Sequence, residues 1–287
     1  MTETILGNEP LVRLGVFLGL LALLMLWEVW WPRRSLGVGR LRRWPGNLGI
    51  VILNTLAVRL VAPGAAVGVA VWAGEAGLGL FNMTAAPYWF AVLFSILAFD
   101  LVIYGQHVAF HKVGPLWRLH RMHHADLDID VTTGSRFHPV EILLSIGIKA
   151  AVVLLLGAPA LAVLLFEVLL NATSMFNHAN IRMPLAVDRW LRLLVVTPDM
   201  HRVHHSWYRD ETDSDFGFNL PWWDRLFGTY RSQPRDGHDG MTIGLTIFRD
   251  PGQLRLDRML LQPLRNETGR TETGPPSQPA PAGTVLD

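Results

Sequence analysis

Three short histidine clusters constrain the fold of this chain more than any other feature of its sequence. Eight of the eleven histidines lie in them, in the patterns HVAFH, HRMHH and HRVHH. The members are His107 and His111, then His120, His123 and His124, and finally His201, His204 and His205. Neutral imidazole is a common metal ligand, and helix residues three or four apart share a face, so each cluster is expected to point one way. One octahedral ion accepts about six ligands, so this many imidazoles predicts two ions and a fold that brings the clusters together.

The composition indicates a membrane protein. Half of the 287 residues are apolar, the mean hydropathy is +0.27, and only 17% are charged, whereas soluble domains carry about a quarter. The net charge of +1 and the lack of a basic tract give no reason to expect a nucleic-acid partner. The chain has no cysteine, which excludes disulfides, thiolate zinc sites and iron–sulfur clusters.

Apolar stretches of membrane-spanning length occur at residues 11–31, 48–72, 88–111 and 140–175. The second is interrupted by Arg59 and by Pro63-Gly64, so it is either kinked or two half-helices. The fourth is broken at residues 157–159, which predicts a hairpin of two spans. The fold class is therefore all-α, a polytopic membrane bundle of about 4–5 spans with a histidine-rich dimetal cap.

The chain divides into three predicted parts. Residues 1–87 form N-terminal transmembrane helices, residues 88–232 form the catalytic domain with the histidine clusters, and residues 233–287 form a C-terminal segment, disordered from about residue 266. The segment at residues 33–43 contains five arginines, whereas the loop at 73–87 is almost uncharged. The positive-inside rule therefore places the arginines and the histidine cap on the cytoplasmic side of the cell inner membrane. Residues 187–196 are basic and amphipathic, as in a segment lying in the membrane interface.

Two polar side chains precede the first histidine cluster on the same helical face. Asp100, Tyr104, His107 and His111 follow one another at spacings of four, three and four. A carboxylate inside a span is costly and normally has a partner. We expect Asp100 or Tyr104 to support a ligand, because a carboxylate that accepts the second N–H of an imidazole fixes its tautomer. The alternative is a polar contact between Asp100 and another helix, for instance with Arg59.

Other histidines and arginines complete the candidates. His178, in the sequence NHAN, is expected to be a ligand; His138 is a ligand, a support for one, or a helix cap; and His238, in a turn-like stretch, is expected to be solvated. Arg121 and Arg202 occupy the same place in both HRxHH patterns and should point away from the ions, toward lipid phosphates or carboxylates. The candidate carboxylates are Asp126, Asp199 and Asp224, and Asp224 is also a possible ligand or support.

These patterns resemble the fatty acid hydroxylase / sterol desaturase superfamily of integral membrane oxygenases. Residues 136–141, 177–180 and 223–229 resemble it too, so the likeness runs from about residue 100 to residue 229. Asp215-Phe216-Gly217 departs from the family's usual NYG, and Ser174 stands where some relatives have a further histidine. The resemblance implies a dimetal centre with two iron ions (Fe2+/Fe3+) in the active enzyme, although zinc can occupy it after purification. The nine implied ligands are His107, His111, His120, His123, His124, His178, His201, His204 and His205.

The resemblance also implies an enzyme that uses O2 and two electrons to hydroxylate or desaturate a lipid C–H bond, with no catalytic side chain beyond the metal centre. The electrons are expected from a separate ferredoxin- or cytochrome-type protein. Hydroxylation is favoured, whereas a sterol, a fatty acyl chain, an ether lipid and a carotenoid all stay open as substrates. The competing functions are a non-catalytic metal-binding or zinc-transport protein and a membrane cytochrome.

Overall fold

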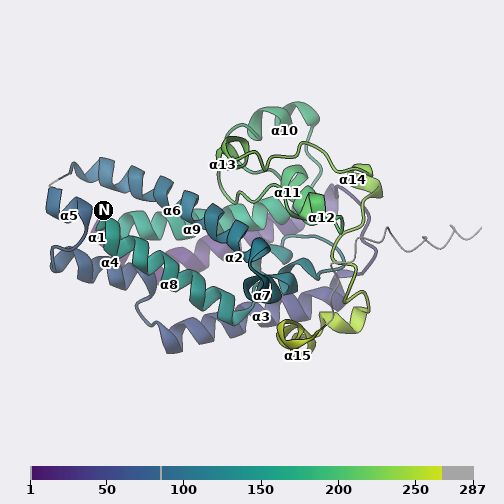
Figure 1. The fold of residues 1–287 in the computed structure, drawn as a ribbon, viewed down its shortest axis with the longest axis horizontal. Coiled ribbons are helices and arrows are strands. Elements are labelled where there is room, and N and C mark those ends of the chain that lie inside the picture. Colours follow the sequence, from purple (N-terminus) through teal and green to yellow (C-terminus); the bar gives the residue numbers. More distant parts are fainter. Residues whose placement is uncertain (1, 85, 267–287) are drawn as a thin grey trace, which may run out of the picture.

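The structure, a computed structural model, describes residues 2–84 and 86–266, and within these ranges it consists of helices and turns without a β-strand (Figure 1). Five segments are long and apolar enough to cross a membrane. They are Glu9–Trp30, Arg40–Thr84, Tyr88–Lys112, Pro139–Leu156 and Ala160–His178. By length and composition these segments make this an integral membrane protein, and the predicted all-α fold is confirmed.

The long helices form an elongated bundle, and the shorter ones gather mainly at one of its ends (Figure 1). The longer helices are α2 (Glu9–Trp30), α3 (Arg40–Val61), α4 (Ala65–Glu75), α6 (Tyr88–Lys112), α7 (Gly114–His124), α8 (Pro139–Leu156) and α9 (Ala160–His178). The shorter ones are α1 (Thr2–Gly7), α5 (Leu80–Thr84), α10 (Leu185–Leu191), α11 (Pro198–His204), α12 (Arg209–Thr212), α13 (Trp222–Leu226), α14 (Gly237–Gly240) and α15 (Leu256–Leu261). Three short 3-10 turns are η1 (Thr133–Ser135), η2 (Pro251–Leu254) and η3 (Gln262–Leu264).

The interrupted second span is two helices rather than one kinked helix. Helix α3 ends at Val61 and α4 begins at Ala65, so the break falls on Pro63-Gly64. Proline lacks the N–H that would continue the helix, which explains why the break lies there. The loop that was expected at residues 73–87 contains a further short helix, α5.

The predicted hairpin of the fourth and fifth spans is confirmed. Helix α8 ends at Gly157, which has a φ of 65°, and α9 follows directly after Pro159. This left-handed conformation favours glycine at the end of a helix. Space demands it as well, because a Cβ on Gly157 would lie 2.7 Å from the carbonyl oxygen of Leu78.

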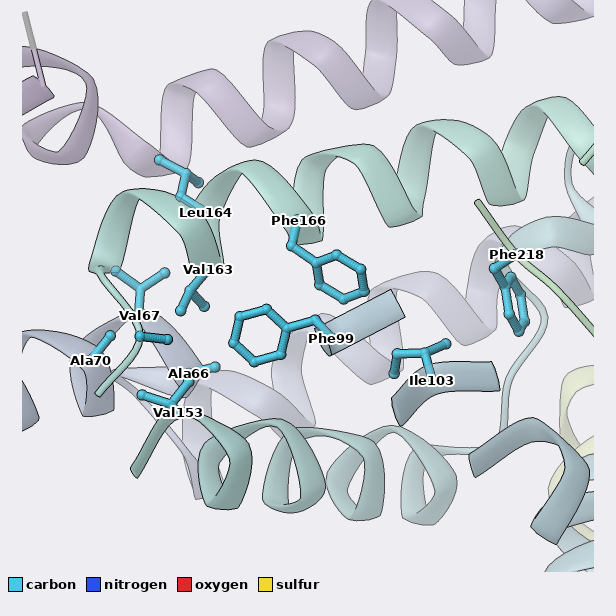
Figure 2. Packing of buried hydrophobic residues seen from close by; sticks show 11 residues of the cluster. Ala66, Val67, Ala70, Phe99, Ile103, Val153, Val163, Leu164, Phe166 and Phe218 are labelled. Atoms are coloured by element: carbon cyan, nitrogen blue, oxygen red, sulfur yellow. The ribbon is translucent and has the colours of Figure 1, made fainter. Parts of the chain in front are cut away.

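The main apolar core lies where α4, α6, α8 and α9 meet (Figure 2). Phe99 of α6 and Phe166 of α9 are stacked with ring centroids 5.2 Å apart. Ala66 and Ala70 on α4 are small enough to let the neighbouring helices approach closely, as is common in membrane bundles. This packing fixes α6 against α9. Helix α6 carries His107 and His111, and α9 carries His178.

We call the end of the bundle where α6, α7, α9 and α11 bring the histidines together the histidine end. The arginine-rich loop lies there too, because Arg33 N donates to Asn180 O over 2.9 Å and Pro32 forms an isolated bridge with Ile181. The predicted disorder from about residue 266 concerns residues outside the described ranges, apart from Asn266 itself.

Candidate metal centre

Nine histidine rings gather at the histidine end in two neighbouring groups, and none of them is more than 3% exposed. The first group contains His107, His111, His120, His124 and His204. The second group contains His123, His178, His201 and His205. Within each group, one nitrogen from every ring lies within 4.8 Å of the others. The fold therefore brings together all nine histidines that the sequence nominated as ligands.

Each HRxHH pattern supplies both groups. Helix α7 directs His120 and His124 to the first group and His123 to the second, while α11 directs His204 to the first and His201 to the second. The expectation that each pattern points one way is therefore wrong. Successive helix residues are turned by about 100°, so the adjacent His123 and His124 face different groups, with ring planes at 90°.

Backbone carbonyls fix the tautomer of several rings. His107 Nδ1 lies 2.7 Å from Phe216 O, His178 Nδ1 lies 2.7 Å from Ser174 O, and His204 Nδ1 lies 2.7 Å from the carbonyl of residue 214. His123 Nδ1 lies 3.3 Å from the carbonyl of residue 136. A carbonyl only accepts hydrogen bonds, so each Nδ1 carries the hydrogen and each Nε2 presents a lone pair in the neutral ring.

These lone pairs face one another. His178 Nε2 lies 3.1 Å from the Nε2 atoms of His123, His201 and His205. Since His123 and His178 both carry their hydrogen on Nδ1, no proton lies between their Nε2 atoms, and the contact is repulsive unless a cation attracts both. Two ligand nitrogens at about 2.1 Å from one ion and at right angles to each other would lie about 3 Å apart. The donor set therefore fits a metal ion.

The first group has the same character. His107 Nε2 and His120 Nε2 lie 3.1 Å apart, although both rings place Nδ1 on an acceptor. The Nε2 atoms of His124 and His204 are buried without a hydrogen-bond partner among the described residues. Buried polar atoms are nearly always paired, so these nitrogens also fit a metal ion. Imidazole donors suit zinc, copper, iron and nickel alike and do not select among them.

Five of the rings beyond the spans are neutral at physiological pH. Burial, together with nearby histidines, lowers the pKa of His123, His124, His201 and His205 well below the ordinary value. Burial lowers the pKa of His204 to about 3. A neutral ring is the form that binds a metal, so these five rings lose no affinity to protonation near pH 7.

Two carboxylates that the sequence did not nominate contact rings of the first group. Glu141, in the first turn of α8, places Oε1 2.7 Å from His120 Nδ1, and its side chain is only 6% exposed. Asp213 places Oδ1 3.4 Å from His111 Nδ1. A carboxylate on the outer nitrogen of a ligand imidazole orients the ring and makes it more basic. An acidic residue in the first turn of an apolar helix was the available signal for Glu141.

Residues 92–229 match the fatty acid hydroxylase family, and they contain all nine histidines and both carboxylates. This region of the chain belongs to that family. An ornithine lipid hydroxylase of Rhizobium tropici is 31% identical over 160 residues, which are 56% of this chain and 47% of that protein. Human alkylglycerol monooxygenase is 28% identical over 172 residues, 59% of this chain and 37% of its own length. Human cholesterol 25-hydroxylase is 28% identical over 148 residues, 49% of this chain and 51% of its own length.

The chain thus spans about half the length, or less, of these relatives. No solved structure matches it. The hydroxylase-family region begins within α6 and ends just after α13, so the likeness covers the candidate metal centre and leaves out α1 to α5.

Within the hydroxylase-family region, the loop at residues 215–219 holds His107 through the Phe216 carbonyl. Asp224 anchors this loop by accepting hydrogen bonds of 2.8 Å from the backbone N–H groups of residues 216 and 217. It also accepts one of 2.6 Å from the Thr229 hydroxyl, which lies 2.9 Å from the Tyr104 hydroxyl. Asp224 and Tyr104 therefore do not contact the histidines directly. They support His107 by holding the loop in place. Burial raises the pKa of Asp224, whereas these hydrogen bonds favour its charged form.

Asp100 anchors the other end of the same loop. Its carboxylate accepts hydrogen bonds from Asn219 Nδ2 over 2.7 Å and from Trp223 Nε1 over 2.8 Å. The alternative of a polar contact with another helix is thus borne out, through Trp223 of α13 rather than Arg59, and Asp100 does not accept directly from a histidine. The departure from NYG at residues 215–217 leaves the loop's support of His107 intact.

The remaining nominated residues lie outside both groups. His138 caps α8, with Nδ1 accepting from Val140 N over 3.2 Å. His238 was expected to be solvated, but it is 6% exposed, because α14, which carries it, packs against α11 and places its Nε2 3.6 Å from Asp199 Oδ2. Arg202 pairs with Asp199, as predicted, whereas Arg121 donates to the carbonyls of residues 262 and 265.

A helix outside the hydroxylase-family region also supports the centre. Arg43 of α3 is fully buried, and its guanidinium donates to Asp126 over 2.8 Å and to Asp130 over 2.5 Å. Burial alone would raise the pKa of Asp126, but the Arg43 guanidinium outweighs it and holds that pKa well below the ordinary value. This ion pair fixes the segment that follows α7, directly after His124. Arg136, also fully buried, donates to Asn47 of α3 over 2.8 Å while its carbonyl holds His123.

Proposed function

We propose that this protein is a membrane-bound di-iron oxygenase that hydroxylates a lipid C–H bond, with residues 88–232 as its catalytic domain. The observation that carries the proposal is the presence of two buried histidine groups. Within each group, Nε2 atoms of different rings face one another at 3.1 Å. Membership of residues 92–229 in the fatty acid hydroxylase family supports it. The related lipid hydroxylases and monooxygenases support a lipid as the substrate class.

The proposed reaction converts a C–H bond and O2, with two electrons and two protons, into a C–OH group and one water molecule. When bound, the iron ions supply the oxidising chemistry that breaks an aliphatic C–H bond, which no side chain can perform. The nine histidines would hold them. The chain's own contribution is to orient the rings through carbonyls and Glu141, and to keep bulk water away from them, since no ring is more than 3% exposed.

The proposed orientation places the histidine end on the cytoplasmic side of the cell inner membrane. The arginine-rich loop lies at that end, where Arg33 contacts Asp199 and Arg34 N donates to Asn180. Short loops rich in arginine stay in the cytoplasm. From there the centre can receive a lipid from the bilayer, O2, and electrons from a separate ferredoxin- or cytochrome-type protein.

The alternative function is zinc transport or another non-catalytic use of the metal. Transport requires ligating groups along a path through the membrane. Here the nine rings are enclosed at one end of the bundle, which favours a fixed centre.

The experiment compares lipids and metal content in cells that express the wild-type chain, His204→Ala, and the control His138→Asn. Asparagine is a good helix cap, so the control should keep α8 intact and retain both metal and product. We expect wild type to produce a hydroxylated lipid in the presence of O2 and a reductant, and His204→Ala to produce none. Unchanged lipids in every class together with metal accumulation would favour transport, and equal products from wild type and His204→Ala would refute the proposed centre.

A further inference from the structure

Helices α10 and α13 expose a set of large apolar side chains at the histidine end. Six of them, in these helices or just after their last residues, are Leu185, Trp190, Leu194, Trp222, Leu226 and Phe227, which are between 44% and 78% exposed. We call these six residues the apolar face. Contiguous apolar surface of this kind marks contact with a partner or a membrane.

The two helices form one unit although about thirty residues separate them along the chain. Trp222 Nε1 donates to Leu193 O over 2.7 Å, and Arg225 Nη2 donates to Arg192 O over 3.2 Å. In Figure 1 they lie together to one side of the bundle, at the top of the view. The apolar face is therefore a single surface built from both helices.

Contacts with α6 fix how far along that span the unit lies. Trp223 Nε1 donates to Asp100, and the Phe227 ring stacks on Tyr104 with centroids 5.4 Å apart. At about 1.5 Å per residue, Asp100 lies about 18 Å and Tyr104 about 12 Å from Lys112, the last residue of α6. The unit thus packs beside the middle of a spanning helix rather than beyond its end.

The exposed apolar residues of the spans also indicate that α10 and α13 lie at the depth of the membrane. On α2 and its C-cap residue they run from Leu11 to Trp31, which corresponds to about 30 Å and matches the hydrocarbon thickness of a bilayer. On α6 they run only from Tyr88 to Leu101, about 20 Å. Beyond Leu101, α6 exposes no large apolar side chain, and Phe227 of the apolar face stacks on Tyr104 in that part.

We propose that the apolar face inserts into the membrane leaflet at the histidine end and completes the hydrophobic belt beside α6. The occupant is lipid: acyl chains against the six apolar residues, and lipid phosphates near the exposed cations Arg182 and Arg189. This extends the interfacial segment expected at residues 187–196 to a second helix and sets its depth. A membrane-inserted face with basic residues at its edge is typical of interfacial helices. The proposal does not depend on the reaction or on the identity of the ions.

The natural chain has no cysteine, so single cysteines can be labelled selectively. Leu194→Cys and Leu226→Cys would carry an environment-sensitive fluorophore in the full-length protein, reconstituted in phosphatidylcholine–phosphatidylglycerol vesicles. Leu23→Cys on the lipid-exposed side of α2 is the matched membrane control, and Asp236→Cys, an exposed polar position, is the matched aqueous control. Quenching is measured with lipids that carry a nitroxide on the acyl chain and, separately, with iodide in water.

We expect nitroxide lipids to quench positions 194 and 226 several-fold more strongly than position 236, and to an extent comparable with position 23. Iodide should give the opposite order. Strong iodide quenching at 194 and 226 would overturn the proposal, because the face would then lie in water. Protection from both quenchers would also overturn it, because the occupant would then be protein, such as a second copy of this chain.

Discussion

The two histidine groups differ in what holds the outer nitrogens of their rings. In the first group, Glu141 and Asp213 bring negative charge to His120 and His111. In the second group, the Nδ1 atoms of His123 and His178 contact backbone carbonyls, and the Nδ1 atoms of His201 and His205 have no hydrogen-bond partner among the described residues. The same ligand type is therefore presented with carboxylate support in one group and without it in the other.

This difference has a physical consequence for the ions. A carboxylate makes the ligand imidazole more basic and offsets part of the charge of a buried cation. Glu141 is well placed for this, because its contact with His120 is the only hydrogen bond of its carboxylate among the described residues, whereas Asp213 also pairs with Lys112. We expect the first group to hold its ion more tightly, and the ion in the second group to exchange first.

The largest effect is expected from His178→Ala, which tests whether the two groups bind their ions independently. Its Nε2 contacts three other Nε2 atoms, so its loss leaves the second group with three rings. We expect bound metal to fall from two ions per chain to one, with no lipid product, while the first group keeps its ion. Metal analysis of the purified protein measures this, with His138→Asn as the control that retains both. Loss of both ions would show that the groups do not bind independently.

The comparison is sharpened by Glu141→Gln, which keeps a hydrogen-bond acceptor beside His120 but removes the charge. Changes to such supporting residues typically cost about 10–100-fold in metal affinity, and we expect that loss for the ion of the first group. Release of metal to a chelator, followed in time, separates the two ions by rate. In wild type we expect the slower phase to come from the first group, and in the variant it should accelerate until the two phases merge.

Asp213→Asn is the matched control for that variant. Asp213 lies farther from its histidine, at 3.4 Å, and shares its charge with a lysine, so a smaller acceleration is expected. Equal effects of the two variants would mean that the support is not specific to His120. A Glu141→Gln protein that releases both ions at wild-type rates would remove the electrostatic difference between the groups.

Much of this arrangement could be predicted from the sequence, because it depends on local spacing. The apolar stretches predicted the spans, and the break at Gly157 predicted the hairpin, since these signals lie within a few residues of one another. The histidine patterns identified the rings that gather at the centre. The division of each HRxHH pattern between two groups was not predicted, because it depends on how α7 and α11 are rotated about their axes.

The supporting contacts could not be predicted because they join distant residues. Glu141 reaches His120 across 21 positions, and Arg43 reaches Asp126 across 83. One sequence contains no signal that pairs such residues. His238 shows the converse, because its turn-like surroundings predicted exposure, whereas the folded chain buries it beside Asp199.

The smallest expected effect tests whether the first group also depends on neutral hydrogen bonds. Tyr104→Phe removes the hydroxyl that lies 2.9 Å from Thr229 but keeps the ring that stacks on Phe227. A hydrogen bond of this kind contributes about 1 kcal/mol to the free energy of unfolding. Asp224 still holds the loop, so metal release from the first group should stay within error of wild type. A release rate that rises as much as in Glu141→Gln would show that the position of the Phe216 carbonyl, rather than carboxylate charge, sets the difference between the two groups.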